Sequence, residues 1–144
     1  MCGRPIDGQE GGSNMPKVAP LVSLEALRRL AAELEDEETC RTFVGSFIGT
    51  WDERQARLRQ AIQASDAKAA MDVVLSVKVS SAMAGAGRLS QLAGNLQVML
   101  LRLGEDIRTS CTMDLFEEIR ACGCATMVQL QADYLEPQTG DRGI

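Results

Sequence analysis

The side chains that carry out most protein chemistry are few in this sequence, and the usual combinations of them are missing. Histidine is absent from all 144 residues, which removes the commonest general base and the commonest metal ligand. Ser80 and Ser81 carry hydroxyl groups, but the sequence offers neither a histidine nor a clearly placed base to activate them. We therefore expect no catalytic residue in this chain and no enzymatic activity.

The cysteines and glycines also lack the spacing of a known reactive or binding motif. The 5 cysteines, at positions 2, 40, 111, 122 and 124, contain no CxxC pair, as is typical of free thiols in a reducing compartment. Cys122 and Cys124 lie two residues apart on a predicted helix, where side chains point about 200° from each other and do not readily chelate one ion. The glycines of MAGAGRL have neither the preceding strand nor the lysine of a phosphate-binding loop. We expect no metal site and no cofactor.

Composition narrows the class of protein further. The length suits about one domain, and 45% hydrophobic residues are enough for a core. With 15 Lys and Arg against 20 Asp and Glu, the chain has no basic stripe for a phosphate backbone, so we expect no nucleic-acid partner. No apolar run approaches the roughly 20 residues that span a bilayer, and the N-terminus lacks the apolar region of a secretory signal. The sequence predicts a cytoplasmic protein without a membrane partner.

The elements that position these residues are predicted to be helices throughout. Residues 1–21 read as a flexible N-terminal leader, and residues 137–144 as a polar C-terminal tail. Between them, residues 22–136 contain apolar residues at spacings of three and four. The predicted segments are a short helix capped by Ser23, a long helix over 40–62, a third helix from Ser65 or Asp66 to Met83, a fourth over 89–107 and a fifth capped by Thr112. These segments predict an all-α fold, an antiparallel up-down four-helix bundle with a short additional N-terminal helix.

Residues 73–80 are the one segment whose local pattern conflicts with this fold. Apolar and other residues alternate there almost strictly, and valine favours strands. A single strand would have no pairing partner, so we predict a helix. Read as a helix, Ala70, Val74, Val77, Ser81 and Ala84 lie on one side. Asp72, Leu75 and Val79 lie mainly on another side.

The same region resembles a known family. Residues 74–89, VLSVKVSSAMAGAGRL, are similar to the signature of histidine-containing phosphotransfer (HPt) domains. The matching positions are Val77, Lys78, Ser80, Ser81, Gly85, Ala86 and Leu89. The helix before it, with its FxxxFIxxW pattern, and the leucine-rich helix after it match the family's order of helices, so the resemblance covers residues 22–134.

Two positions depart from the family pattern. Leu75 stands where the family has its phosphorylated histidine, and Val79 stands where it has a glycine that leaves room for a receiver domain. Leucine has no nucleophilic nitrogen, so the resemblance implies the shape of a phosphotransfer domain without its chemistry. Either both residues belong to the core of a slightly rotated bundle, or they form an exposed apolar patch beside Lys78. Lys78 is then either a solvated surface lysine or a contact for the carboxylates of a receiver domain.

From this resemblance we expect a signalling module that binds a response-regulator receiver domain or a histidine kinase without carrying a phosphoryl group. The residues expected to bind the partner are Leu75, Lys78, Val79 and Asp72. One alternative is a phosphorelay protein that uses an unrecognised carrier residue, and another is a structural helical module that self-associates. The expected state is a monomer or a weak homodimer.

Overall fold

The computed structural model describes residues 20–136, and this part of the chain is helical without any strand. Its elements are α1 (Leu24–Leu34), α2 (Glu37–Gly49), α3 (Trp51–Gln63), α4 (Ala67–Met83), α5 (Gly87–Leu103), α6 (Ser110–Leu130) and a π-helical turn, η2 (Gln131–Leu135). The all-α prediction is therefore confirmed. The predicted tail and all but the last two residues of the predicted leader lie outside the described residues. None of the described helices is long and apolar enough to cross a membrane.

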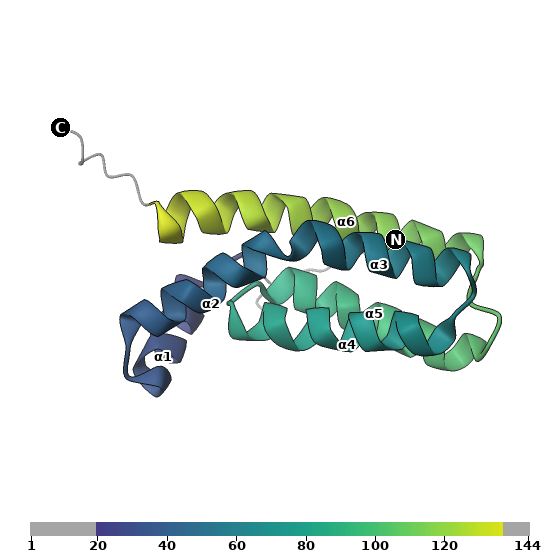
Figure 1. Cartoon of the computed structure of the whole chain (residues 1–144), viewed down its shortest axis with the longest axis horizontal. Helices are drawn as coiled ribbons and strands as arrows, with labels where there is room; N and C mark the ends of the chain where they lie inside the picture. Colours follow the sequence, from purple (N-terminus) through teal and green to yellow (C-terminus); the bar gives the residue numbers. More distant parts are fainter. Residues whose placement is uncertain (1–19, 137–144) are drawn as a thin grey trace, which may run out of the picture.

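The single long helix predicted over 40–62 is two helices, which meet at Thr50. The Thr50 backbone leaves the helical region, with φ −99° and ψ 0°. Its hydroxyl donates to the Ser46 carbonyl oxygen at 2.9 Å, the same oxygen that accepts from the Thr50 backbone N–H at 3.0 Å. A threonine hydroxyl that bonds back to the preceding turn competes with the helical pattern. Thr50 thus marks a break that apolar periodicity alone does not reveal, although α2 and α3 lie end to end (Figure 1).

The last four α-helices surround a common core. Helix α4 packs against α3 and α5, and α6 packs against α3 and α5, so the four helices lie side by side along the length of the molecule (Figure 1). Helix α1 lies at one end and contacts α2 and α4. Only the middle of its predicted apolar side is enclosed, because Leu27 and Leu30 are buried while Leu24 and Leu34 remain 42% and 40% exposed.

Polar side chains fix the starts of four helices. Ser23, Asp36 and Asp66 each accept a backbone N–H of the first turn of α1, α2 and α4, as expected for capping residues. The predicted cap of the last helix is wrong, because Thr109, not Thr112, caps α6. Thr112 is fully buried, and its backbone N–H donates to the Thr109 hydroxyl oxygen at 3.1 Å. Helix α6 therefore begins at Ser110, before the residue that the sequence pattern favours.

The turn between α4 and α5 depends on one glycine. Gly85 has φ +77°, and a Cβ atom there would lie 2.6 Å from the Ser23 carbonyl oxygen. The Ser23 backbone N–H donates to the Gly85 carbonyl oxygen at 2.8 Å, which ties the start of α1 to this turn. The sequence predicts a helix-ending turn at Gly85 and Gly87; Gly85 makes the turn, and Gly87 is the first residue of α5. Residues with a Cβ do not readily adopt this φ.

The end of α6 is attached to α2 through the π-helical turn. Arg41 donates from Nη1 to the Tyr134 carbonyl oxygen at 3.0 Å and from Nη2 to the Leu135 carbonyl oxygen at 2.8 Å. Its guanidinium carbon also lies 5.7 Å from the centre of the Tyr134 ring. The Tyr134 hydroxyl donates to Glu37 at 3.2 Å. Carbonyl oxygens in the last turn of a helix lack intrahelical N–H donors, and Arg41 donates to two of them here.

Candidate functional site

The segment with a strand-like sequence, residues 73–80, lies in the middle of α4 and is helical. The side predicted to pack is buried: Ala70, Val74, Val77, Ser81 and Ala84 are all at most 3% exposed. Burial of this helix face against the neighbouring helices therefore outweighs the β-propensity of the valines, because the buried residues recur with the helical period of 3.6.

Leu75 and Val79 lie on the other side of α4 and are 38% and 57% exposed. Of the two alternatives drawn from the sequence, the structure selects the exposed orientation. Met83 follows one turn later and is 43% exposed. Since the three residues are spaced at i, i+4 and i+8, they form one row along the helix. We call Leu75, Val79 and Met83 the α4 ridge; Met83 was missed by the sequence analysis, although its spacing from Val79 was the signal that could have revealed it.

Lys78 lies beside the α4 ridge and is held against α5. Its Nζ donates to Gln97 Oε1 at 2.9 Å, and its carbonyl oxygen accepts from Ser90 Oγ at 2.9 Å. A Cβ at Gly94 would lie 3.8 Å from Lys78 Cε, so the lysine stem passes over a position without a side chain. The Lys78 ammonium group therefore has a fixed place at the edge of the α4 ridge. Its hydrogen bond to Gln97 uses one of the three N–H donors of the ammonium group.

Asp72, also predicted to bind the partner, forms an exposed ion pair on α4. Its Oδ2 lies 3.6 Å from Lys68 Nζ, and the two side chains are 64% and 88% exposed. Such an exposed i, i+4 pair contributes at most about 1 kcal/mol. Asp72 lies on the same side of α4 as Leu75, but within residues 20–136 it pairs with Lys68 and not with Lys78.

The remaining candidate groups do not assemble into a reactive site. Ser81 is fully buried, and its hydroxyl has no hydrogen-bond partner among the described residues, so it is out of reach of a substrate. Cys40 is buried, Cys111 and Cys124 are exposed, and all are free thiols. Cys122 is half-buried, and burial raises the pKa of its thiol. Among residues 20–136, no group of His, Cys, Asp or Glu is arranged to hold a metal ion.

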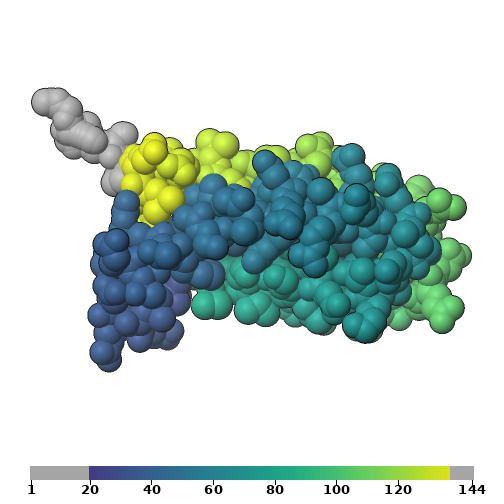
Figure 2. Space-filling view, viewed as in Figure 1, coloured from purple at the N-terminus to yellow at the C-terminus, as the bar shows by residue number. Residues whose placement is uncertain are grey.

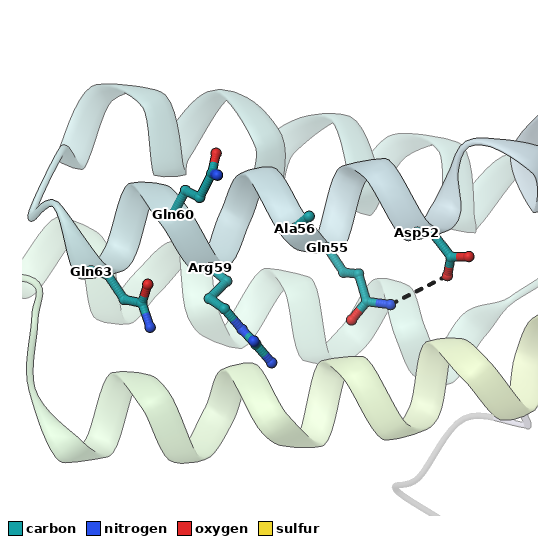
Figure 3. Close-up of a pocket in the computed structure, with 6 residues that line it drawn as sticks. All are labelled: Asp52, Gln55, Ala56, Arg59, Gln60 and Gln63. Carbon is teal, nitrogen blue, oxygen red and sulfur yellow. Dashed lines mark hydrogen bonds between the residues drawn. The ribbon is translucent and has the colours of Figure 1, made fainter.

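A polar hollow of about 440 Å³ lies along α3 (Figure 3). Its lining residues, from Asp52 to Gln63, all belong to that one helix, and Gln55 donates to Asp52 at 3.4 Å. The Arg59 guanidinium carbon lies 5.6 Å from the centre of the buried Phe116 ring, toward α6. The space-filling view also shows α3 along the same face of the molecule as α4 (Figure 2). The hollow contains no residue of the α4 ridge and no serine, threonine, cysteine or histidine side chain.

Gly123 is a residue whose role only the structure reveals. A Cβ atom at this position would overlap the Cζ2, Cε2 and Cη2 atoms of Trp51. Trp51 is 3% exposed and belongs to the core. The glycine between Cys122 and Cys124 is therefore explained by ring packing, not by a property of the two thiols.

A comparison with known protein families and structures identifies this fold. A model of the Hpt domain matches residues 42–133. This chain belongs to the Hpt domain family. The crystal structure of histidine-containing phosphotransfer protein B (HptB) from Pseudomonas aeruginosa PAO1 matches 83% of this chain and 99% of that chain, with a TM-score of 0.68 and 21% sequence identity. At this identity the similarity concerns the fold; no curated protein sequence matches the chain.

As a member of the Hpt family, this chain is unusual in one respect that its sequence shows directly. It contains no histidine at all. The resemblance of residues 74–89 to the family signature assigns the phosphorylated position to Leu75, which the structure places on the exposed side of α4. The Hpt family is thus shown for this chain, whereas the placing of Leu75 at the nucleophile position stays a prediction from the sequence resemblance.

Proposed function

We propose that this Hpt-family chain is a phosphotransfer-inactive module that binds a two-component signalling partner, a receiver domain or a histidine kinase, through the α4 ridge. The observation that carries the proposal is the exposure of Leu75 at the position of the family histidine, in a chain with no histidine. A leucine there offers contact area but no phosphoryl acceptor. The module then acts by occupying its partner, which blocks or scaffolds a phosphorelay.

The chemistry of the surface supports contact with an apolar partner surface that also carries acidic groups. Fully burying a leucine, valine or methionine side chain contributes roughly 1.5–3 kcal/mol before the costs of association, and the exposed fractions of the α4 ridge leave part of that gain available. Lys78 adds a positive charge whose position is fixed by Gln97. Receiver-domain carboxylates are the groups that this ammonium would meet, so receiver domains are the first partners to test.

The proposal includes a finer description of the fold and the domain. We take α3 to α6 as the antiparallel four-helix bundle and α1 with α2 as an N-terminal addition to it, which is larger than the single short helix that the sequence predicts. Residues 22–136 then form one cytoplasmic unit. We propose that it is monomeric when free, because partner binding uses the α4 ridge that a self-associated form would cover.

Titration of the protein into a panel of receiver domains and histidine-kinase domains tests the binding proposal. We expect at least one domain to bind, and Leu75→Glu and Val79→Glu each to weaken that binding about tenfold or more, since each loses apolar contact and adds a negative charge beside acidic groups. Val128→Glu is the matched control. Val128 is 70% exposed on α6, the helix diagonally opposite α4 in the ring of packed helices, and we expect no change there.

Two outcomes would overturn the proposal. If no receiver or kinase domain binds, or if Leu75→Glu binds as well as the parent chain, the α4 ridge is not the docking surface. Incubation with a phosphorylated receiver tests the alternative of an unrecognised carrier, because a covalent phosphoryl adduct on this chain would contradict inactivity. Sedimentation at several concentrations tests self-association, and a stable dimer disrupted by Val79→Glu would show that a second copy occupies the ridge.

A gain-of-function variant tests the scaffold itself. Leu75→His with Val79→Gly restores the two family residues on α4. If the helix keeps the family geometry, we expect this variant to accept a phosphoryl group from a phosphorylated receiver, whereas Val79→Gly alone does not. Failure of both variants to accept phosphate, with the receiver still bound, would show that the ridge recognises partners in a different geometry.

A further inference from the structure

A second surface feature lies at the C-terminal end of α5, the end opposite to the turn that joins α4 and α5. An open pocket of about 440 Å³ lies between the last turns of α5 and the first turn of α6. Helix α5 ends at Leu103, Gly104 turns the chain with φ +70°, and α6 begins only at Ser110. The two helix ends are thus separated by a connection, and the pocket lies beside it. Its volume is in the range of small-molecule sites.

The pocket is apolar on its α5 side, and its base is held in place by hydrogen bonds. Val98, Met99 and Leu103 line it, and Val98 is 48% exposed. The Thr112 hydroxyl donates to the Met99 sulfur at 3.6 Å, and the Thr109 and Thr112 hydroxyl groups lie 2.9 Å apart. The contact with the buried Thr112 thus helps to hold the Met99 side chain in place at the base of the pocket.

One cation accompanies this apolar surface. Arg102 also lines the pocket and is exposed. Within residues 20–136, it takes part in neither of the two ion pairs, and neither Glu105 nor Asp106 pairs with it. A guanidinium group beside apolar side chains is suited to a carboxylate attached to an apolar chain, because its planar donors match the two oxygens.

We propose that the pocket between α5 and α6 binds a small amphiphile, an apolar chain that carries a carboxylate, of the medium-chain fatty acid class. The chain lies on Val98, Met99 and Leu103, and the carboxylate meets Arg102. The pocket shares no lining residue with the α4 ridge, so this binding is independent of the proposed docking of a signalling partner.

Two exposed cysteines supply an internal readout. Cys111 lines the pocket, whereas Cys124 is exposed on α6 but is not among the lining residues. The full chain is alkylated with iodoacetamide in the presence of decanoate below its micelle concentration, and each cysteine-containing peptide is followed by mass spectrometry. At a ligand concentration ten times its dissociation constant, we expect Cys111 to react about tenfold more slowly, because only the free fraction reacts. The reaction of Cys124 stays unchanged.

Two surface variants and a neutral ligand test the assigned chemistry. Arg102→Gln should weaken protection by decanoate roughly two- to fivefold, as expected for an exposed ion pair, and leave the weaker protection by decanol unchanged. Val98→Asp should abolish protection by decanoate. Circular dichroism of both variants confirms that they are folded, as their exposed positions predict.

Several results would overturn the assignment. Decanoate that leaves Cys111 as reactive as before, or that slows Cys111 and Cys124 equally, shows that no ligand occupies the pocket. Equal protection by decanol and decanoate contradicts the carboxylate and the role of Arg102. Protection of Cys111 that rises with protein concentration, without any decanoate, shows instead that a second copy of the chain covers the pocket.

Discussion

The contact between Gly123 and Trp51 gives a quantitative test of how the core is packed. In an ordinary helix, replacing an interior glycine by alanine stabilises the helix by about 1 kcal/mol. In α6, the added methyl group of Gly123→Ala overlaps three atoms of the Trp51 ring. The ring is rigid and 3% exposed, so it cannot move aside into solvent. Overpacking of this kind costs about 1–3 kcal/mol, at times more, and we place this rigid overlap at the upper end. We therefore expect a net loss of about 2 kcal/mol.

Urea unfolding, followed by circular dichroism and by the fluorescence of the single tryptophan, measures this loss. Gly45→Ala is the matched control, because it is also a glycine inside a helix but the nearest atom to its added Cβ is Leu135 Cδ1 at 3.9 Å. We expect that variant to gain about 0.5–1 kcal/mol. Trp51→Phe should destabilise the parent chain but cost less in the Gly123→Ala background, since the smaller ring relieves the overlap. A Gly123→Ala chain as stable as the parent would refute this description of the core.

Three further predictions concern the helix ends and one ionisable group. Burial raises the pKa of Tyr134 above its ordinary value of 10.0, so the near-ultraviolet absorbance of this single tyrosine should report ionisation at a higher pH than free tyrosine does. Because the pKa of Tyr134 is higher in the folded than in the unfolded chain, the stabilisation that it contributes is complete below about pH 10 and is lost as the pH rises further. Tyr134→Phe should therefore make the free energy of unfolding decrease less steeply above about pH 10. Ionisation of Tyr134 at the pH of free tyrosine would contradict this prediction. Arg41→Lys loses the paired hydrogen bonds to the carbonyl oxygens of Tyr134 and Leu135. We expect the free energy of unfolding to decrease by about 1–2 kcal/mol and amide hydrogen exchange in η2 to become faster. Unchanged exchange would contradict the attachment of η2 to α2 by Arg41. Asp66→Ala removes the acceptor of the Ala69 N–H and should lower the free energy of unfolding by about 1 kcal/mol. An unchanged free energy of unfolding in urea would contradict the role of Asp66 as a cap.

Helix α4 shows which structural features could be predicted from the sequence and which could not. Its local pattern favours a strand, yet the chain offers no strand to pair with, and the helical alternative divides the residues into a buried and an exposed face. The structure has the same two faces. The prediction succeeds because burial along one face is a property of periodicity, which a sequence carries directly. The sequence leaves open whether Leu75 and Val79 face the core or the surface, because periodicity does not say which way a helix face points.

The predicted helix boundaries are wrong where an apolar pattern continues past the residue at which a side-chain hydrogen bond ends or starts a helix. Residues 40–62 keep one helical period, but Thr50 bonds back to Ser46 and separates α2 from α3. The last helix starts at Ser110 because the hydroxyl of Thr109, and not that of the buried Thr112, caps its first turn by accepting from the Thr112 backbone N–H. In both cases the deciding interaction is a single side-chain hydrogen bond, which competes with a pattern spread over many residues.

Residue identities and spacing alone were enough for the helical class and for the absence of any histidine, and the resemblance to the Hpt signature predicts that Leu75 occupies the position that the family uses for chemistry. These follow from residue identity and periodicity, which need no knowledge of neighbours. The tertiary structure alone decided that Leu75, Val79 and Met83 form one exposed row, that Lys78 is held by Gln97, and that Gly123 makes room for Trp51. Each of these depends on how helices distant in the sequence pack, and exposure and steric fit are properties of that packing.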